Sequence, residues 1–195
     1  MAKKVLSIFL VWFLVNVIVG CCPEPLTIFY KINDLKISNC RLKDVLIDNA
    51  SVQQKEFRIS INLNAESFVK KAPPLMVNAA YATRCEDNHV GLKTDIKAFT
   101  ITCNKDILGV EAGKPIDLGK MNVYKVGFFD DQKNQRKTVN EWIGILNNGG
   151  FQLAFEWFIE FNQPINAEDF LKFTVKIKQE DGSELSAETN AVKID

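Results

Sequence analysis

The chain contains a single histidine, His89, close to other side chains that could bind a metal ion. Cys85, Glu86 and Asp87 precede it within four residues. Zinc sites usually draw several histidine or cysteine ligands at recognisable spacings, and this stretch offers one of each. We therefore interpret the stretch as a solvated loop, and we expect neither a metal ion nor a cofactor.

Ser67 and Lys70 form a Ser-x-x-Lys pattern, which carries the serine nucleophile in penicillin-recognising enzymes. Those enzymes also need a Lys-Thr-Gly segment, and this sequence has none. Because two fixed residues in four arise readily by chance, we interpret Ser67 as part of a strand that ends before the two prolines at 73–74.

Glu156 and Glu160 lie four residues apart on one face of a predicted strand. At about 3.4 Å per residue their backbones are roughly 13 Å apart. The paired carboxyl groups of glycosidases are closer, at about 5 to 9.5 Å. We therefore expect these glutamates to form cross-strand ion pairs, with lysines at alternate positions of a later strand as partners: Lys172, Lys176 and Lys178.

Phe158 and Phe128 are the aromatic residues that could form a contact surface. Phe158 interrupts the polar face of its strand. Phe128 adjoins Phe129, and the two must point in opposite directions if this segment is extended. A contiguous exposed aromatic patch would mark a contact site for a glycan or another protein. Coverage of Phe158 by a second sheet is the alternative.

Alternation of apolar and polar residues predicts that most of the chain forms short strands. The clearest segment is 151–161, in which every odd-numbered residue is apolar, and we expect it to be the central strand of the core. The same alternation marks five further segments: 28–37, 57–64, 77–85, 99–103 and 171–177. A change of parity at Asn33-Asp34 predicts a β-bulge. Asp181-Gly182 predicts a hairpin turn that leads into a closing strand over 185–194.

One segment has a helical period instead. Val139, Trp142, Ile143 and Leu146 recur at helical spacing, and the Asn-Gly-Gly at 148–150 can end a helix. We therefore predict one short helix near residues 138–147. Strands in succession, without regular strand–helix alternation, favour a mainly β protein. We expect an antiparallel, immunoglobulin-like β-sandwich, with a closed barrel as the alternative.

The N-terminus has the pattern of a secretory signal over residues 1–20. Lys3 and Lys4 precede an apolar run at 5–19. This run is shorter than the about 20 residues that a membrane-spanning helix needs. It ends in Ile-Val-Gly-Cys, which resembles the bacterial lipobox, where the cysteine sulfur receives a diacylglycerol.

We therefore expect lipidation of Cys21, a tether over residues 21–26 and one domain over 27–195. An ordinary secretory signal and an N-terminal membrane helix are the alternatives.

Four further cysteines could form disulfides: Cys22, Cys40, Cys85 and Cys103. An even number in an oxidising envelope favours two bridges. If Cys85 and Cys103 lie on a simple hairpin, they are too far apart to bridge, because bridged Cα atoms lie about 4.4–6.8 Å apart. We expect Cys22–Cys85 with Cys40–Cys103, over Cys22–Cys103 with Cys40–Cys85. Buried free thiols are the alternative.

A sparse set of residues runs through most of the chain: Cys21-Cys22, Tyr81-Ala82, Ile96, Phe99, Ile101, Asp106, Ala112-Gly113, Phe173, Val175, Asp181-Gly182 and Thr189. With these residues the chain resembles a family of small lipoproteins of Bacteroides-type bacteria that is grouped as a domain of unknown function. The resemblance implies an envelope location and a β-rich fold. It implies no catalytic residue.

The charge balance argues against nucleic acid as a partner. Basic and acidic residues number 24 each, and without Lys3 and Lys4 the acidic residues are in slight excess. No basic patch or stripe appears. We expect a cell-envelope protein, held by its lipid on the outer membrane, with a non-enzymatic binding or structural role toward another envelope protein or a glycan. The alternative is an envelope hydrolase that acts on glycan or peptide through loop carboxylates.

Overall fold

The computed structural model describes residues 12, 26–71, 90–125, 136–148, 156–165 and 167–195, and it is mainly β, as predicted. The strands are β1 (Leu26–Arg41), β2 (Asp44–Val45), β3 (Ala50–Val52), β4 (Phe57–Lys71), β5 (Val90–Leu92), β6 (Ile96–Cys103), β7 (Met121–Lys125), β8 (Lys137–Thr138), β9 (Glu156–Phe161), β10 (Phe173–Gln179), β11 (Glu184–Glu188) and β12 (Val192–Ile194). The helices are η1 (Gln54–Glu56), η2 (Leu118–Lys120) and α2 (Val139–Asn147). The predicted strand at 77–85 lies outside the described residues.

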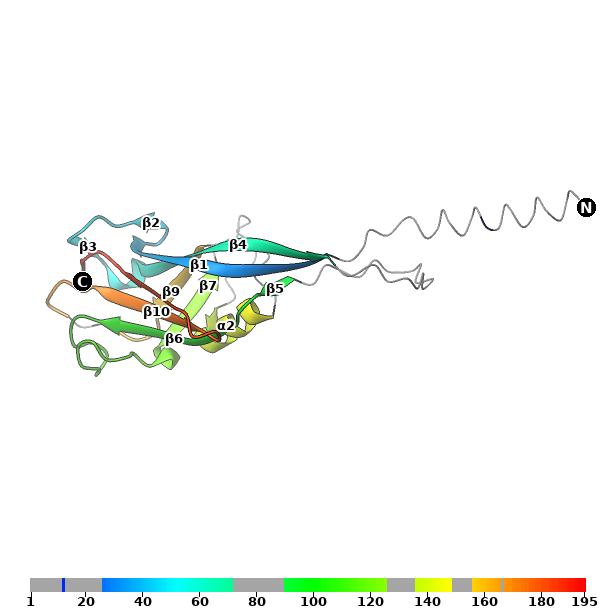
Figure 1. Cartoon of the computed structure of the whole chain (residues 1–195). Helices are drawn as coiled ribbons and strands as arrows, with labels where there is room; N and C mark the ends of the chain where they lie inside the picture. Colours follow the sequence, from blue (N-terminus) through cyan, green and yellow to red (C-terminus); the bar gives the residue numbers. More distant parts are fainter. Residues whose placement is uncertain (1–11, 13–25, 72–89, 126–135, 149–155, 166) are drawn as a thin grey trace, which may run out of the picture.

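The described strands form three sheets. The largest has the order β2-β1-β4-β9-β7-β8, with β5 paired to β1, and the others are β11-β10-β6 and β12-β3. Most neighbours are antiparallel, whereas the short strands β5 and β12 pair in parallel with β1 and β3. Figure 1 shows β1 and β4 side by side along the length of the domain, with β2 and β3 at one end and the start of β1 at the other.

The pairing of β1 with β4 runs from Leu26–Lys71 to Arg41–Phe57, with one register shift between Ile32 and Asp34. This shift is the bulge that the change of parity predicted. On β4 the alternate apolar residues from Phe57 to Leu63 are buried, as the pattern indicated. The bulge keeps Ile32, Leu35 and Ile37 on the same buried face of β1.

β9 lies between β4 and β7, so its described part has the interior position that was predicted. Ile159 and Phe161 are buried in the main core, and Trp157 packs against it. Residues 151–155, the first half of the predicted strand, lie outside the described part of the chain.

One main core contains side chains from all three sheets. The rings of Phe57, Phe161 and Phe173 meet there, with centroids 5.6 and 5.7 Å apart across the contacts to Phe173. Phe57 and Phe161 belong to the large sheet, and Phe173 belongs to β10 of the three-stranded sheet. This shared core is consistent with the expected β-sandwich.

Helix α2 lies within one residue of its predicted bounds. The Thr138 side chain accepts a hydrogen bond from the Glu141 backbone, and the Glu141 carboxylate accepts one from the Thr138 backbone, which completes a capping box. Trp142 packs on Phe99 and Trp157, with ring centroids 5.6 and 5.9 Å away. At the other end, the Asn147 side-chain amide donates to the Ile96 carbonyl and accepts from its N–H, so the helix is joined to β6.

The end of the chain differs from its prediction. The Asp181-Gly182 turn is present, with Gly182 at φ 86°. The closing strand, predicted as continuous over 185–194, is divided into β11 and β12. The break falls at Thr189, where the side chain accepts a hydrogen bond from the Phe173 backbone. The following strand, β12, then pairs with β3 instead of β10.

The favoured Cys40–Cys103 disulfide is not formed, and this prediction is wrong for a geometric reason. Cys103 is a buried free thiol in the main core. Cys40 packs with Tyr124 and Phe158 in a second cluster, on the face of the large sheet opposite the main core, which we call the outer face. The sheet therefore separates the two thiols. The free Cys103 also excludes the alternative bridge to Cys22, and Cys22 and Cys85 lie outside the described residues.

Burial raises the pKa of the Cys103 thiol, so little of the reactive thiolate forms near neutral pH. We predict that Cys103 of the folded protein resists alkylation and becomes reactive on denaturation. Peptide mapping without reduction should find no Cys40–Cys103 linkage. Recovery of that linked peptide would contradict the separation of the two thiols by the sheet.

The core predicts that two positions of β10 differ clearly in their contribution to stability. Phe173 is fully buried and Lys176 is exposed. Phe173→Ala should lower the free energy of unfolding by about 3–5 kcal/mol, because it removes a large aromatic side chain from a packed interior. Lys176→Ala should change it by no more than about 0.5 kcal/mol. Urea denaturation compares the two, and equal midpoints would show that Phe173 is not in the core.

Candidate functional site

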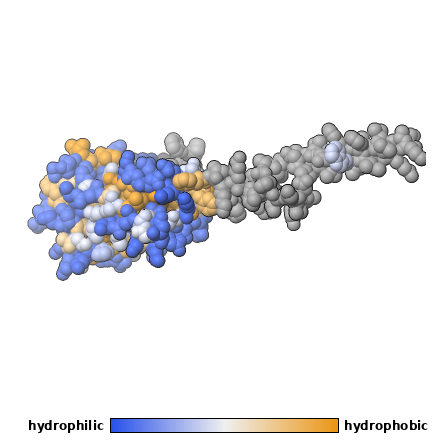
Figure 2. Space-filling view, in the orientation of Figure 1, coloured by the Kyte–Doolittle hydropathy of each residue, from blue (hydrophilic) through white to orange (hydrophobic). Residues whose placement is uncertain are grey.

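Three exposed aliphatic side chains gather in one loop, residues 42–49, which we call the tip loop. It connects β1 to β3 and includes β2. Leu42, Val45 and Ile47 are 53%, 62% and 79% exposed. Figure 2 shows apolar surface at this end of the domain, which is where Figure 1 places β2 and β3. Isolated exposed aliphatic residues are common, whereas several in one short segment favour an interaction site.

The backbone of the tip loop is fixed to the body of the domain. The Leu42 N–H donates to the Glu56 carbonyl (2.7 Å), and the Leu46 N–H donates to the Asn39 carbonyl (2.8 Å). The Asn49 N–H donates to the Ala191 carbonyl (2.8 Å). Hydrogen bonds at both ends and in the middle therefore hold the loop in one conformation.

Two asparagine side chains connect the centre of the loop to the body of the domain by hydrogen bonds. The Asn39 amide donates to the Asn190 carbonyl, and the Asn190 amide donates to the Leu46 carbonyl, each at 2.6 Å. Leu46 itself is buried. Its burial fixes Val45 and Ile47, its two neighbours, on the solvent side. A loop ordered before binding loses less conformational entropy when it meets a partner.

Leu42 has an unusual backbone conformation for its side chain, with φ 55°. Left-handed backbone costs a non-glycine residue about 1–2 kcal/mol. A leucine at this turn therefore places an apolar side chain in solvent where a glycine would be less strained. Such outliers are found at functional positions more often than elsewhere.

The tip loop has mixed charges around its apolar residues. Lys43, Asp44 and Asp48 lie inside it, and Arg41 forms an ion pair with Glu56 (3.8 Å) at its base. An apolar centre with a polar rim is the usual composition of a protein–protein interface.

The candidate contact residue Phe158 is not on the surface. It is 2% exposed and stacks on Tyr124, with ring centroids 5.8 Å apart. The prediction that Phe158 forms an exposed contact surface is therefore wrong, because the outer face of the large sheet is covered at this point. Phe128, its proposed companion, lies outside the described residues, as do Cys21, Cys22 and the whole Cys85–His89 stretch.

Ser67 and Lys70 do not form a catalytic pair. Both belong to the regular ladder of β4, opposite Tyr30 and Thr27. Residues three apart on a strand are about 10 Å apart and belong to opposite faces. This strand geometry gives no support to a catalytic pair.

Glu160 binds arginines instead of the expected lysines. One carboxylate oxygen lies 3.1 Å from a terminal nitrogen of Arg58, and the other lies 3.0 Å from two nitrogens of Arg136. Two of the expected lysines pair elsewhere, Lys172 with Glu188 and Lys176 with Glu184. Glu160 is thus the shared anion of a cluster with two arginines.

Arg58 is buried, and its contacts explain how a charged group can lie there. Its Nε donates to the Tyr124 hydroxyl (2.8 Å), and a terminal nitrogen donates to the Phe57 carbonyl. With the Glu160 contact, all three guanidinium nitrogens have partners. A buried charge is tolerated when it is paired and hydrogen-bonded in this way. We interpret this cluster as structural.

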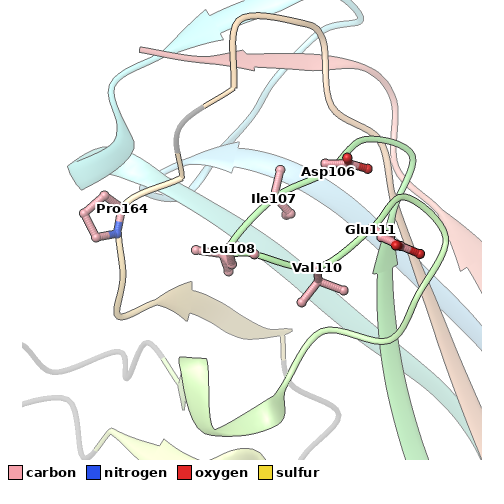
Figure 3. Close-up of a pocket in the computed structure, with 7 residues that line it drawn as sticks. Asp106, Ile107, Leu108, Val110, Glu111 and Pro164 are labelled. Carbon is pink, nitrogen blue, oxygen red and sulfur yellow. The ribbon is translucent and has the colours of Figure 1, made fainter.

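A hollow of about 480 Å³ lies between residues 106–111 and Pro164 (Figure 3). A tight turn forms most of its wall, since Ile107 and Val110 exchange backbone hydrogen bonds around Gly109. Its two carboxylates belong to Asp106 and Glu111. The Asp106 carboxylate accepts a hydrogen bond from the Ala112 N–H (2.7 Å), so it closes the loop. This geometry gives no specific support to a hydrolase.

The described residues contain no group of three or more histidine, cysteine or acidic side chains that could hold a metal ion. No described helix is both long enough and apolar enough to cross a bilayer.

The tip loop has no signal in the sequence that distinguishes it from a buried strand. Val45, Leu46 and Ile47 form a short apolar run, and such runs are typical of buried strands. Only the three-dimensional contacts show that the middle residue is buried and its neighbours are exposed. No protein-family model, curated protein or solved structure matches this chain.

Proposed function

We propose that this chain is a lipid-anchored cell-envelope protein with a non-enzymatic binding role, and that the tip loop contacts its partner. The observation that carries the proposal is the exposure of Leu42, Val45 and Ile47 on a backbone held by hydrogen bonds along its length. Exposed aliphatic side chains gain free energy when a partner removes them from water.

The anchor in this proposal is a lipid on Cys21. Its support is the apolar run that ends in a lipobox-like Ile-Val-Gly-Cys, together with the resemblance to small lipoproteins of Bacteroides-type bacteria. The outer membrane is the location that this resemblance favours. Several acyl chains on one cysteine would hold the protein firmly, since each buried methylene adds about 0.8 kcal/mol.

The length of β1 separates the anchor from the tip loop. β1 has 16 residues and begins at Leu26, five residues after Cys21. At about 3.3 Å per residue it is roughly 50 Å long. The tip loop follows its last residue, Arg41. A protein held at Cys21 would therefore present the tip loop well away from the anchoring membrane.

The chemistry of the tip loop favours a protein partner over a glycan. Its exposed residues are aliphatic, and the loop contains no aromatic residue on which a sugar ring could stack. Three side chains cover far less than the about 800 Å² per partner of a standard interface. They suit the role of central interface residues that enter an apolar pocket on the partner.

The anchor predicts metabolic labelling at one residue. Cells that express the full chain should incorporate labelled palmitate into it, and Cys21→Ser should abolish the label and release the protein from membranes. Cys22→Ser is the matched control, because it changes the neighbouring thiol and leaves the lipobox cysteine in place. Equal labelling of the wild type and Cys21→Ser would contradict the anchor.

The binding role predicts a position-specific cross-link. A photoreactive amino acid at position 47 of the full chain should capture a partner in native membranes, and mass spectrometry should identify it. The purified partner should then bind Ile47→Asp at least about tenfold more weakly than the wild type, as for an anchor residue in an interface.

The control for this experiment is Phe68→Asp, which places the same charge at an exposed apolar position of the opposite end. It should bind the partner as the wild type does. Ile47→Asp should also leave the denaturant midpoint nearly unchanged, since the position is exposed. Equal affinity of both variants for the partner would contradict the tip loop as the binding site.

A further inference from the structure

The end of the β1–β4 pair opposite the tip loop carries a second exposed apolar group. Phe29 and Phe68 lie directly opposite each other in the register. Phe68 is 38% exposed and Phe29 is half-buried. Figure 2 shows apolar surface at this end of the domain, where Figure 1 places β5 and the start of β1.

A lysine packs on this aromatic pair. The Lys93 ammonium lies over the Phe68 ring, 4.8 Å from its centroid, and the Lys93 backbone N–H donates to the Tyr30 carbonyl. In the six paired rows from Leu26–Lys71 to Lys31–Glu66, the charged residues are three lysines and one glutamate: Lys31, Lys70, Lys71 and Glu66. This end of the described ladder is therefore basic, unlike the chain as a whole.

The short tether fixes where this end would lie. Four residues separate Cys21 from Leu26, and the five Cα–Cα steps from one to the other span at most about 18 Å when the chain is fully extended. Phe68, opposite Phe29, lies three rows from the start of the ladder, or about 10 Å along the strand. If Cys21 carries the lipid, the aromatic pair cannot be far from the headgroups.

We propose that the Phe29–Phe68 face, with Lys93, rests on the headgroup layer of an anionic phospholipid bilayer beside the lipid anchor. This inference rests on the proposed lipid at Cys21. Lysines at a membrane surface are attracted to anionic lipids, and lysine side chains can extend their charge to the interface while their stems stay apolar. A bilayer is the occupant that a five-residue tether brings to this surface.

The test uses the full lipidated chain with a photoreactive diazirine amino acid in place of Phe68. The protein is reconstituted into phosphatidylcholine vesicles with or without phosphatidylglycerol, and irradiation is followed by mass spectrometry of lipid adducts. We expect adducts at position 68, in higher yield with phosphatidylglycerol. The same amino acid at position 47, in the tip loop, should give at least about tenfold less adduct, since β1 extends roughly 40 Å from Phe29, the partner of Phe68, to the tip loop.

A charge reversal separates electrostatic contact from simple proximity. Lys93→Glu should lower the adduct yield at position 68 about fivefold in the anionic vesicles, the effect expected of one basic residue at such a surface. Lys55→Glu reverses an exposed charge near the tip loop and should leave the yield unchanged. Circular dichroism of each variant confirms that the fold is retained.

The outcomes distinguish this inference from the anchor itself. A chain that does not float with the vesicles contradicts the lipid anchor, and the headgroup contact falls with it. A chain that floats but gives equal adduct yields at positions 68 and 47 overturns the headgroup contact alone. A yield that is unaffected by Lys93→Glu overturns the electrostatic contact of this face with anionic lipid.

Discussion

The pairing of β1 with β4 is the constraint on which the rest of the described structure depends. Their ladder runs from Leu26–Lys71 to Arg41–Phe57 and accounts for most residues of both strands. A slip of one residue would exchange the two faces of a strand and move its apolar residues into solvent. The single bulge between Ile32 and Asp34 corrects the parity once, so that Ile32 shares the buried face of Leu35 and Ile37. Both ends of the domain are thereby fixed relative to one another.

The large sheet is buried on both faces where β4 and β9 lie side by side. One face carries the main core, and the outer face carries Cys40, Tyr124 and Phe158. Arg58 lies among these residues, where an unpaired charge would be costly. Its contacts with Glu160, Tyr124 and the Phe57 carbonyl offset that cost. The outer face is therefore closed at its centre by packing and by satisfied polar groups.

Periodicity predicted the features of the fold that depend on local sequence. The bulge, the capped helix α2, the Asp181-Gly182 turn and the interior position of β9 all follow from spacing or turn chemistry. In each case a local pattern and the tertiary packing require the same conformation, and such agreement allows the structure to be predicted from the sequence.

Features that depend on which surfaces meet were not predictable in this way. Phe158 interrupts a polar face, and only its burial in the folded chain, where it is 2% exposed, shows that this face is covered. The prediction of a Cys40–Cys103 bridge was wrong because sequence spacing does not reveal on which side of a sheet a thiol lies. The tip loop was missed for the converse reason, because Val45 and Ile47 have the residue types of a core and the exposure of a surface.

Because both faces of the large sheet are buried at its centre, the exposed apolar side chains at the two ends of the β1–β4 ladder are surfaces left for contacts. A large apolar side chain is exposed either because the fold cannot bury it or because a partner buries it on binding. The first explanation does not suit the tip loop. There the chain buries Leu46 and uses Asn39 and Asn190 to hold the segment, while it leaves Val45 and Ile47 in water. A loop with no binding role could reach the same conformation with polar residues at those two positions, because neither contributes to the core. Order in the backbone together with apolar side chains outside it is the combination that binding favours, and it occurs at the end that the β1–β4 ladder places farthest from Leu26.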